Sequence, residues 1–455
     1  MAIYDLSGKN KYYTLYTLLR EDITGGRYRA GEKLPAKRAL AKELGVSVVT
    51  VQLAYEQLLA EGYAYSRERS GYYVDKVNVQ PSPTRAVGER RTPENRAEEK
   101  YSVDFVRGAA PAKLFPFSVW AKLMREVLSD CGEHLLERVP IDGDWELRSE
   151  ISAYLYRARG IDAPPERIVI GAGAEYLYGV IVQLLGREKL YALENPGYGK
   201  ISAAYSLNGA RFVPIDVLES GISAEQLAKS GAEVLHISPA HQFPTGVITP
   251  ASTRSRIMEW AENGDRYIIE DDYDSEFRLS GKPIYSLHSL CPDRVVYMNT
   301  FSKSLAPSMR MGYMVLPSAL KDRFDAMFSS AANVVPLFEQ KTLAAMLRKG
   351  HFERHINRLK NYYRAVRSSV KSAFSNVGDC KIFDTGGGLH MLASFSRYPT
   401  DEAVKTAAAA LNARVKCVGD YLIAPMKVWE GCVVLNYGGI DAESLDIFAK
   451  KLAEL

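Results

Sequence analysis

One stretch of the sequence, T-F-S-K-S-L-A-P-S-M-R-M-G, has residue types that could hold an aldehyde cofactor bearing a phosphate. It begins with Thr300 and Ser302, continues to Lys303, and reaches Arg310 seven residues later. A lysine amine forms a Schiff base with an aldehyde, and an arginine with hydroxyl donors binds a phosphate dianion. Pro307 interrupts any helix between the lysine and the arginine, so both can converge from a loop. The alternative is a basic surface loop.

Length and composition indicate a globular protein with more than one domain. The chain has 455 residues, 47% of them hydrophobic and 25% charged, and a formal net charge of +4. This length favours two or three domains, and the mild charge does not by itself indicate nucleic acid. The five cysteines form no C-x-x-C pair or metal-ligand cluster, so we expect a cytoplasmic protein without a metal. No apolar run approaches the ~18 residues of a membrane helix.

The first 76 residues follow the plan of a winged helix-turn-helix. Apolar residues recur at helical spacing in Tyr12 to Thr24, in Ala36 to Leu44 and in Val48 to Glu61. Ser47 is a suitable N-cap for the third of these helices. Two short β-prone pieces follow, joined through R-S-G. In such a domain the third helix enters the major groove of DNA.

The charge of this segment suits DNA. Residues 1–76 hold 12 Lys/Arg against 9 Asp/Glu, and phosphate contacts supply most of the affinity for DNA. The predicted phosphate contacts lie on the second helix and the wing: Lys37, Arg38, Lys42, Arg67 and Arg69. The predicted base contacts lie at the exposed start of the third helix: Ser47, Thr50 and Gln52, beside Val48 and Val49. The alternative is a small helical cap with ordinary surface charge.

This segment resembles the GntR-type winged helix. The resemblance includes L-P-A-K-R-A-L-A-K-E-L-G-V-S and T-V-x-x-A-Y-E-Q-L-x-A-E-G-Y. Such domains usually have polar or basic residues after the serine, where this sequence has Val48 and Val49. We therefore expect base reading to depend on thymine methyl groups, on Thr50 and Gln52, and on the wing.

Residues 77–100 have the composition of a flexible linker. They include three prolines, five Lys/Arg and four Glu, with almost no apolar residue. Because such a segment cannot form a core, we expect it to tether the first domain to residues 101–455.

Residues 101–455 alternate between helical and β-prone segments, which predicts an α/β fold with a mostly parallel sheet. The predicted strands are 167–170, 190–193, 211–215, 234–237, 267–269 and 295–298. Ligands of such sheets bind beyond the carboxyl ends of the strands, and the turns at these ends contain the residues of interest.

Three of these turns suit a planar cofactor with a phosphate. The small residues of Gly171 to Glu175 would let backbone N–H groups approach a phosphate. Tyr198 could stack on an aromatic ring. His241 and Gln242 could contact the cofactor or satisfy the loop backbone. Each turn also has an ordinary structural explanation, as a turn glycine, a packed tyrosine or a polar loop.

A fourth turn, Glu270-Asp271-Asp272-Tyr273-Asp274, places four carboxylates in five residues at the end of a strand. A metal site is the alternative, but no histidine accompanies these carboxylates. A pyridinium nitrogen needs one ionised carboxylate beside it. We assign that role to Asp271, and we expect Tyr273 to donate to the phenolate oxygen of the ring.

With these motifs in place, residues 101–455 resemble the aspartate-aminotransferase-like fold, which is fold type I of the pyridoxal 5′-phosphate enzymes. The whole chain resembles the MocR/GabR-type regulators of the GntR superfamily. The motifs are E-N-P-G-Y (194–198), H-Q-F-P-T-G (241–246), E-D-D-Y-D-S-E-F-R (270–278) and S-K-S-L-A-P-S-M-R-M-G-Y (302–313).

The resemblance implies pyridoxal 5′-phosphate as the cofactor, with a Schiff base at Lys303, the ring on Tyr198 and Asp271 at the pyridine nitrogen. It implies phosphate contacts from Ala174, Glu175, Thr300, Ser302 and Arg310. It further implies binding to promoter DNA and a domain-swapped homodimer, in which each DNA-binding domain packs against the other subunit's large domain. A small ligand would control transcription.

Two departures from the aminotransferases concern the ligand. Those enzymes hold the substrate α-carboxylate with an arginine of a late strand, which here reads V-V-L-N and ends at Asn436. Their N-P-T-G turn here begins with Phe243, as is usual in the regulators. Lys200 could replace the arginine with a point charge, and His390, after a run of glycines, is expected to line the same pocket.

Three hypotheses follow. The chain is a cofactor-dependent regulator whose effector is an amino acid or amine forming an external aldimine, or is pyridoxal phosphate itself. Alternatively, it is a functional aminotransferase tethered to a DNA-binding domain. In the third hypothesis the regulator has lost the cofactor and uses its large domain only for dimerisation, but the presence of both Lys303 and Arg310 argues against that.

Overall fold

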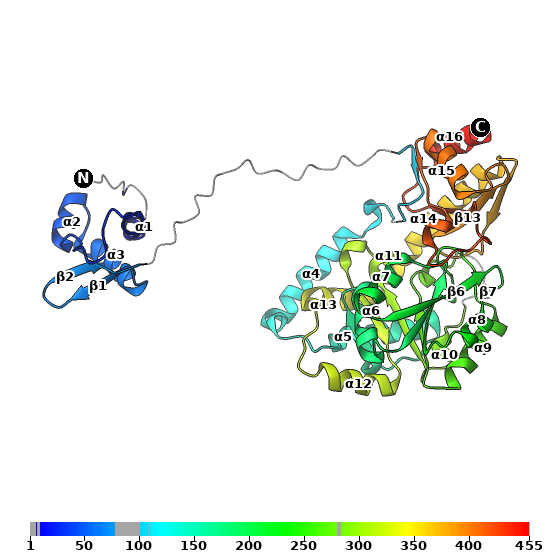
Figure 1. Ribbon diagram of the computed structural model, residues 1–455, viewed down its shortest axis with the longest axis horizontal. Coiled ribbons are helices and arrows are strands. Elements are labelled where there is room, and N and C mark those ends of the chain that lie inside the picture. Colours follow the sequence, from blue (N-terminus) through cyan, green and yellow to red (C-terminus); the bar gives the residue numbers. More distant parts are fainter. Residues whose placement is uncertain (1–5, 7–9, 78–100, 109, 280–283, 455) are drawn as a thin grey trace. The chain divides into compact units, whose positions relative to one another are not determined.

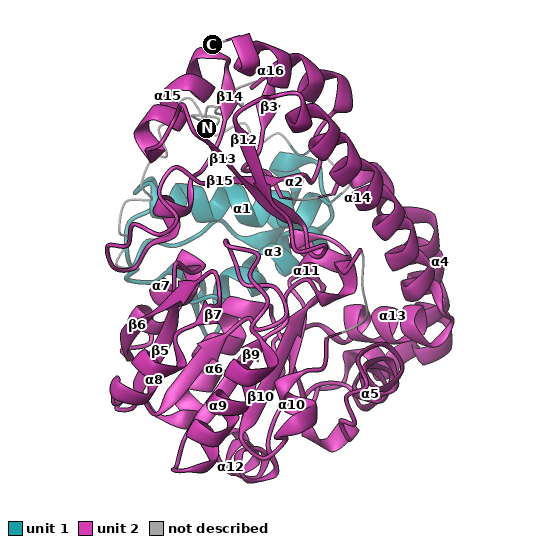
Figure 2. Cartoon of the chain, turned by 90° about the vertical axis from the view of Figure 1, so that its right-hand side faces the viewer, with its two compact units in different colours: residues 1–98 teal, residues 99–455 magenta. Residues whose placement is uncertain are grey.

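The computed structural model describes residues 6, 10–77, 101–108, 110–279 and 284–454 (Figure 1). The chain divides into two compact units, Met1–Glu98 and Glu99–Leu455 (Figure 2). The predicted linker lies outside the described residues, apart from its first residue, so its boundaries stay a prediction. Among the described residues, no helix is long and apolar enough to cross a membrane.

The small unit consists of three helices and a hairpin, as predicted. Its elements are α1 (Lys11–Thr24), α2 (Lys37–Leu44), α3 (Val48–Ala60), β1 (Ala64–Arg67) and β2 (Gly71–Val74). The two strands are antiparallel. All three helices and the hairpin contribute to one apolar core, which includes Leu15, Leu19, Leu40, Val51, Tyr55, Leu58 and Val74. The helical periodicity of the sequence therefore identified the faces that pack together.

The large unit is built on an eight-stranded sheet of order β4-β11-β10-β9-β8-β5-β6-β7. Its strands are β4 (Ile168–Gly171), β5 (Leu190–Asn195), β6 (Arg211–Leu218), β7 (Gly221–Ile222), β8 (Val234–Ile237), β9 (Tyr267–Asp271), β10 (Val295–Thr300) and β11 (Gly312–Val315). Strands β10, β9, β8, β5 and β6 are parallel neighbours. Strand β11 runs antiparallel between β10 and β4, so the mostly parallel sheet is confirmed.

Strand residues alternate between the two faces of this sheet, as the pleat requires. In β4, Ile168 and Ile170 belong to one apolar cluster and Val169 to another. The helices that accompany the sheet are α4 (Phe117–Cys131), α5 (Trp145–Arg159), α6 (Ala174–Leu185), α7 (Gly199–Leu207), α8 (Ala224–Lys229), α9 (Ala251–Glu262), α10 (Leu287–Leu290), α11 (Phe301–Ser304), α12 (Ser318–Phe328) and α13 (Leu337–Arg348). Burial on both faces explains why the strands are nearly continuous apolar runs.

A smaller sheet and three helices follow in the chain. They are α14 (His351–Ser375), β12 (Cys380–Phe383), β13 (His390–Phe395), α15 (Asp401–Ala410), β15 (Val433–Asn436) and α16 (Ala442–Glu454). Strands β12, β13 and β15 form an antiparallel sheet. Strand β3 (Val103–Asp104) pairs with β14 (Ala413–Arg414), so the beginning of the large unit joins its C-terminal part.

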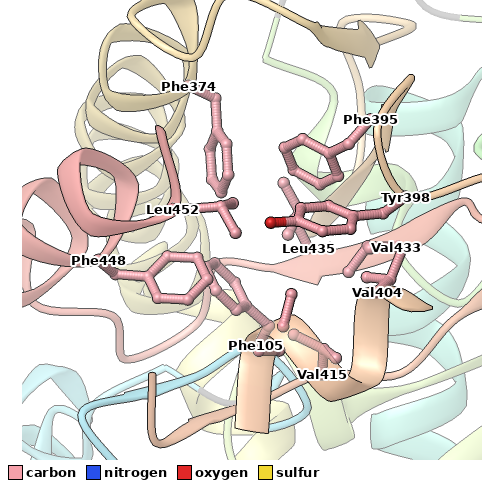
Figure 3. A pocket seen from close by; sticks show the side chains of 12 residues that line it. Phe105, Phe374, Phe395, Tyr398, Val404, Val415, Val433, Leu435, Phe448 and Leu452 are labelled. Atoms are coloured by element: carbon pink, nitrogen blue, oxygen red, sulfur yellow. The ribbon is translucent and has the colours of Figure 1, made fainter. Parts of the chain in front are cut away.

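An apolar cavity of about 20 Å³ lies inside this C-terminal part (Figure 3). Phenylalanines from separate segments line it, among them Phe105, Phe374 and Phe448. A volume near that of one water molecule leaves no room for an organic ligand. The cavity is therefore a packing defect and not a ligand site.

Candidate cofactor site and DNA-binding surface

The large sheet brings the predicted cofactor residues to one edge. Strands β5, β8, β9 and β10 are parallel neighbours, so their carboxyl ends lie side by side. Met298 of β10, for example, pairs with Asp271 of β9. The chain after these strand ends contains Tyr198, His241, Tyr273 and Lys303.

The return of the chain through β11 places Arg310 beside the start of α6. Gly312 pairs with Thr300 on one side and with Gly171 on the other. Arg310, two residues before Gly312, therefore lies between the end of β10 and the turn that follows β4. Its Nη2 donates a hydrogen bond to the carbonyl oxygen of Ala172 at 3.3 Å.

The turn before α6 has a shape that suits an anion. Gly173 has a φ of 86°, and a Cβ there would lie 3.2 Å from the Cζ of Arg310. Glycine therefore allows the guanidinium to approach the backbone closely. Ala174 and Glu175 open α6, and the first N–H groups of a helix have no partner within it.

Thr300 and Ser302 lie at the junction of β10 and α11. Thr300 is the N-cap residue of α11, and both residues are half-buried. Thr300 pairs with Gly312, close to Arg310 in the chain. Hydroxyl, guanidinium and backbone N–H donors thus gather in the region where the sequence predicted a phosphate.

Glu175 adds a carboxylate to this region and pairs with two cations. The Nζ of Lys200 lies 2.8 Å from its Oε1, and the Nη2 of Arg310 lies 3.8 Å from its Oε2. The hydrogen bond from Lys200 lowers the pKa of Glu175. The predicted effector residue Lys200 is therefore held beside the predicted phosphate contacts.

Lys303 is exposed to solvent as a residue, whereas protein atoms around its amine desolvate it and lower its pKa. Asp274 opposes this effect, and Lys200 adds to it. A Cβ on Gly108 would lie 3.7 Å from the Nζ of Lys303 and 3.3 Å from the Oδ1 of Asn436. A lowered pKa favours the neutral, nucleophilic amine. The sequence had not singled out Gly108 or Asn436 as neighbours of the lysine.

Asp271 is buried among aromatic side chains. Its Oδ2 accepts a hydrogen bond from the Tyr178 hydroxyl at 2.6 Å and lies 3.5 Å from the Nε2 of His236. The Nδ1 of His236 is 2.9 Å from the Tyr205 hydroxyl. Tyr178, His236 and Tyr205 come from α6, β8 and α7 and belong to no motif recognised in the sequence. The packing of these elements brings Tyr178 and His236 to Asp271.

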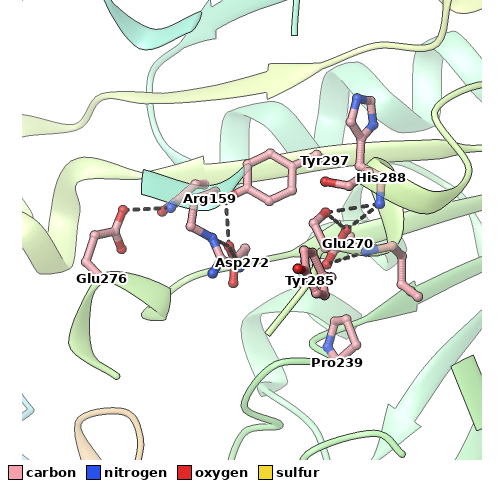
Figure 4. A network of polar contacts seen from close by, with 12 residues as sticks. Arg159, Pro239, Glu270, Asp272, Glu276, Tyr285, His288 and Tyr297 are labelled. Carbon is pink, nitrogen blue, oxygen red and sulfur yellow. Dashed lines mark hydrogen bonds and ion pairs between the residues drawn. The ribbon is translucent and has the colours of Figure 1, made fainter. Parts of the chain in front are cut away.

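Two other carboxylates of the same turn have structural partners (Figure 4). Glu270 accepts two backbone N–H groups at the start of α10, at 3.1 and 3.0 Å. Asp272 forms a buried ion pair with Arg159 at 2.7 Å and accepts the Tyr297 hydroxyl at 2.6 Å. The two remaining carboxylates, Asp271 and Asp274, contact residues of the candidate site.

Two histidines lie close to Asp274, and the expectation that no histidine accompanies these carboxylates was wrong. The Nδ1 of His241 is 2.8 Å from the Oδ2 of Asp274 and 3.1 Å from the Tyr273 hydroxyl. The rings of His241 and His390 are 4.7 Å apart. Potential metal-ligating atoms of His241, Asp274 and His390 lie within 4.8 Å of one another. Outside this cluster, the Nε2 of His390 donates a hydrogen bond to the Pro244 carbonyl at 2.9 Å.

Gln242 is bonded to the backbone and side chains of two neighbouring loops, and its contact with a cofactor stays a prediction. Its Nε2 donates to the carbonyls of Pro196 and Phe243 at 2.8 and 2.6 Å. Its Oε1 accepts from the N–H and the hydroxyl of Thr245 at 3.1 and 2.6 Å. Both ends of the buried amide are thus satisfied, which is the alternative that the sequence had left open.

Tyr198 and Phe243 form an aromatic side of the site. Their rings meet edge to face, with centroids 5.6 Å apart. Phe243 also contacts His390 at 5.1 Å and Tyr421 at 5.0 Å. Tyr198 is 43% exposed, so its ring is accessible to a planar ligand.

The small unit presents its predicted phosphate contacts on α2 and the hairpin. Arg38 and Lys42 are exposed on α2. In the hairpin, the Arg67 guanidinium lies 4.8 Å from the centre of the Tyr73 ring, and Arg69 occupies the turn with a φ of 57°. Basic groups are thus exposed on α2 and on the hairpin, two elements that contact α3.

The polar side chains at the start of α3 already have partners. The Ser47 Oγ accepts the Thr50 N–H at 3.1 Å and lies 2.8 Å from the Thr50 hydroxyl. Gln52 donates to the Glu56 Oε1 at 2.8 Å and accepts from the Lys37 Nζ at 3.4 Å. Of the predicted base contacts, Ser47 is thus a helix cap and Gln52 bridges two charged residues.

The large unit belongs to the aminotransferase-like fold class. It is similar to the kynurenine aminotransferase of Pyrococcus horikoshii, solved in complex with PMP, with a TM-score of 0.68 and 22% sequence identity. The similarity covers 77% of this chain and 90% of that chain. At this identity, the comparison establishes the fold.

Sequence comparison extends over both units. Residues 11–74 match the model of the bacterial regulatory proteins of the gntR family. The chain is 32% identical over 452 residues to the probable rhizopine catabolism regulatory protein MocR of Rhizobium meliloti, covering 95% of this chain and 90% of that protein. It is 38% identical over 363 residues to the HTH-type transcriptional regulator YdeL of Bacillus subtilis, covering 80% and 78%. The chain therefore belongs to the MocR-type regulators of the GntR family and is a DNA-binding transcription regulator.

Proposed function

We propose that this regulator binds pyridoxal 5′-phosphate at the carboxyl edge of its large sheet and uses it to sense a small ligand. The observation that carries the proposal is the gathering of Lys303, Arg310 and Asp271 at this edge. Lys303 offers an amine of lowered pKa, and Arg310 a guanidinium beside the start of α6. Asp271 offers a buried carboxylate. These three groups suit the aldehyde, the phosphate and the ring nitrogen.

The neighbouring side chains would orient the ring. Bound pyridoxal phosphate supplies an electrophilic aldehyde and an electron-withdrawing ring. Tyr198 would cover one face of the ring, and Tyr273 would donate to its phenolate oxygen. His241 supports this role of Tyr273, because its Nδ1 lies 3.1 Å from the hydroxyl. Gly173, Ala174, Thr300 and Ser302 would surround the phosphate.

The proposed effector is an amino acid, an amine or pyridoxal phosphate itself. Asn436 stands where aminotransferases carry an arginine, and Lys200 is paired with Glu175 at 2.8 Å. A carboxylate would therefore meet no bidentate clamp from these two residues, and its orientation for turnover would be poor. We infer a sensor in preference to a working aminotransferase. His390, buried against Phe243, would line the effector pocket.

The proposed architecture has a DNA-binding domain at residues 1–76, a linker at 77–100 and a sensor domain at 101–455. As the family resemblance implies, two chains would form a homodimer on promoter DNA, with each DNA-binding domain packed against the other subunit. Effector binding would then alter the geometry of the paired DNA-binding domains.

The test is a visible absorption spectrum of the full chain mixed with pyridoxal phosphate, followed by a panel of amino acids and amines. We expect a Schiff-base band that Lys303→Ala abolishes and that Lys450→Ala, at an exposed lysine of α16, preserves. A compound that shifts the band is an effector or a substrate, and assays for the oxo acid product separate the two. A band unchanged by every compound favours the cofactor as the signal. A band that persists in Lys303→Ala contradicts the proposed site.

A further inference from the structure

The start of α3 presents an apolar surface to solvent. The buried face of this helix consists of Val51, Ala54, Tyr55 and Leu58. At 3.6 residues per turn, Val49 and Leu53 lie on the opposite face. Val48 is 41% exposed, Val49 64% and Leu53 42%. Three branched apolar side chains therefore stand at the position from which a winged helix-turn-helix contacts base edges.

The polar residues of the same turn are less available. Ser47 and Thr50 are hydrogen bonded to each other, with their hydroxyls 2.8 Å apart. Gln52 is bonded to Glu56 and Lys37, at 2.8 and 3.4 Å. A bidentate contact to adenine would require Gln52 to break both of these interactions. Apolar contact requires no such change.

Exposed basic side chains on the elements that pack against α3 indicate the occupant of this apolar surface. Arg38 and Lys42 are exposed on α2, and Arg67 and Arg69 are exposed on the hairpin. A protein partner with an apolar face would have to desolvate or neutralise these charges. The major groove of DNA combines flanking phosphates with one apolar group on its base edges, the C5-methyl of thymine. The charge pattern therefore favours duplex DNA.

We propose that Val48 and Val49 read thymine methyl groups in the major groove, so that the preferred operator carries A·T pairs opposite the start of α3. This inference rests on the DNA-binding function of the chain and specifies its sequence preference. Hydroxyl, amide and guanidinium contacts would then position the domain, and apolar contacts would discriminate between bases.

The first part of the test uses the full chain and a randomised duplex library. Sites enriched by binding are resynthesised with single thymines replaced by uracil, which removes the methyl group and leaves base pairing intact. Each thymine that meets Val48 or Val49 should bind about fourfold more weakly as uracil, the value expected for one buried methyl group. Thymines elsewhere in the site should tolerate the replacement.

The second part pairs these DNA changes with protein variants. Val48→Ala and Val49→Ala should weaken binding to the thymine site and remove the difference between thymine and uracil at the matching position. Lys42→Ala should weaken binding to both sites equally, because a phosphate contact does not sense the methyl group. Ala60→Ser, at the exposed far end of α3, should change neither affinity.

The outcomes separate this inference from the underlying function. Enrichment of a site that tolerates uracil at every thymine overturns the inference and leaves DNA binding intact. The same holds if discrimination persists in Val48→Ala and Val49→Ala. If these variants instead change only the oligomeric state in solution, the surface is a contact between chains and the inference is wrong. Failure to bind any duplex contradicts the DNA-binding function itself.

Discussion

Glu175 places a negative charge where the proposed cofactor carries its own. Its carboxylate pairs with Lys200 and Arg310, two cations that would otherwise face a phosphate. We therefore predict that Glu175→Gln strengthens binding of pyridoxal phosphate by about two- to fivefold at low salt, and by less at high salt. Titration of the cofactor absorbance at two ionic strengths measures this change.

Glu225 provides the matched control for that experiment. It is an exposed glutamate paired with Lys229 at 2.6 Å on α8, outside the turns that hold the candidate site. Glu225→Gln should leave cofactor affinity unchanged. Equal binding in Glu175→Gln would mean that the carboxylate has no net effect on cofactor affinity. Weaker binding would mean that the carboxylate assists the site, for example by holding Arg310 in position.

Glu194 gives the stability of the large unit a predictable pH dependence. Burial raises the pKa of this carboxyl to about 8, whereas an unfolded glutamate titrates at about 4.3. Between these values the folded chain binds the proton and the unfolded chain does not, so stability falls as the pH rises. Glu194→Gln removes this loss, and its free energy of unfolding relative to wild type should rise by a few kcal/mol from pH 5 to pH 8.5.

Urea unfolding followed by tryptophan fluorescence measures this difference, because all four tryptophans lie beyond residue 101. Glu402→Gln, at an exposed glutamate of α15, should show a pH-independent offset from wild type. A pH-independent offset for Glu194→Gln as well would show that Glu194 is ionised in the folded chain.

At the residue scale, the sequence identified candidate site residues in the turns better than it identified the side chains that contact them. Lys303, Asp271 and Arg310 were identified as candidates because each stands in a motif after a predicted strand. Tyr178 and His236 were missed because nothing local marks them: they reach Asp271 only through the packing of α6 and the pairing of β8 with β9. For Gln242 the sequence left two roles open, because a polar side chain in a loop can form hydrogen bonds with the loop backbone or with a ligand.

The wing hairpin orders its arginine through aromatic packing. Tyr65 pairs with Tyr73 across the two strands, and their rings stack at 5.7 Å. Arg67 shares that face, because alternate residues of a strand point the same way. It lies 4.8 Å from the Tyr73 ring and donates to the Tyr65 hydroxyl at 3.1 Å. This packing reduces the freedom that the side chain would lose on meeting a phosphate.

We therefore predict that Arg67→Ala weakens DNA binding similarly for all sequences and lowers the slope of log affinity against log salt by about 0.9. Binding isotherms at several salt concentrations measure the slope. Arg157→Ala, which removes an exposed ion pair with Glu353 of the large unit, is the control and should keep the wild-type slope. A wild-type slope in Arg67→Ala would exclude a phosphate contact by this residue.

Elements were predicted well where periodicity is strong and less well at their ends. The small-unit helices begin and end within one residue of their predicted bounds. Strands β5 and β9 were predicted too short because Asn195 and Asp271 are polar, yet both residues lie within the observed strands. Strand β11 was missed because its residues had been interpreted as part of the lysine motif. Its antiparallel course brings Arg310 to the start of α6. Without this strand, the sequence did not predict how Arg310 reaches the start of α6.

A ligand controls this regulator only if its binding to the large unit changes DNA binding by the small unit. Such coupling is reciprocal: an effector that changes DNA affinity by some factor must have its own affinity changed by the same factor when DNA is bound. The sequence predicted both sites from local motifs. It contains no corresponding signal for the coupling, which depends on how the units assemble.

Lys303→Ala tests this coupling in the whole molecule. Because Lys303 lies in the large unit, we predict that the variant retains basal DNA affinity. The ligand that shifts the wild-type spectrum should no longer change this affinity, and DNA should no longer change the apparent affinity for the ligand. Fluorescence anisotropy of labelled operator with and without the ligand measures the first effect, and spectral titration with and without operator measures the second. Lys450→Ala should retain both responses. If Lys303→Ala retains the response of DNA binding to the ligand, the signal reaches the DNA-binding unit without the proposed cofactor lysine.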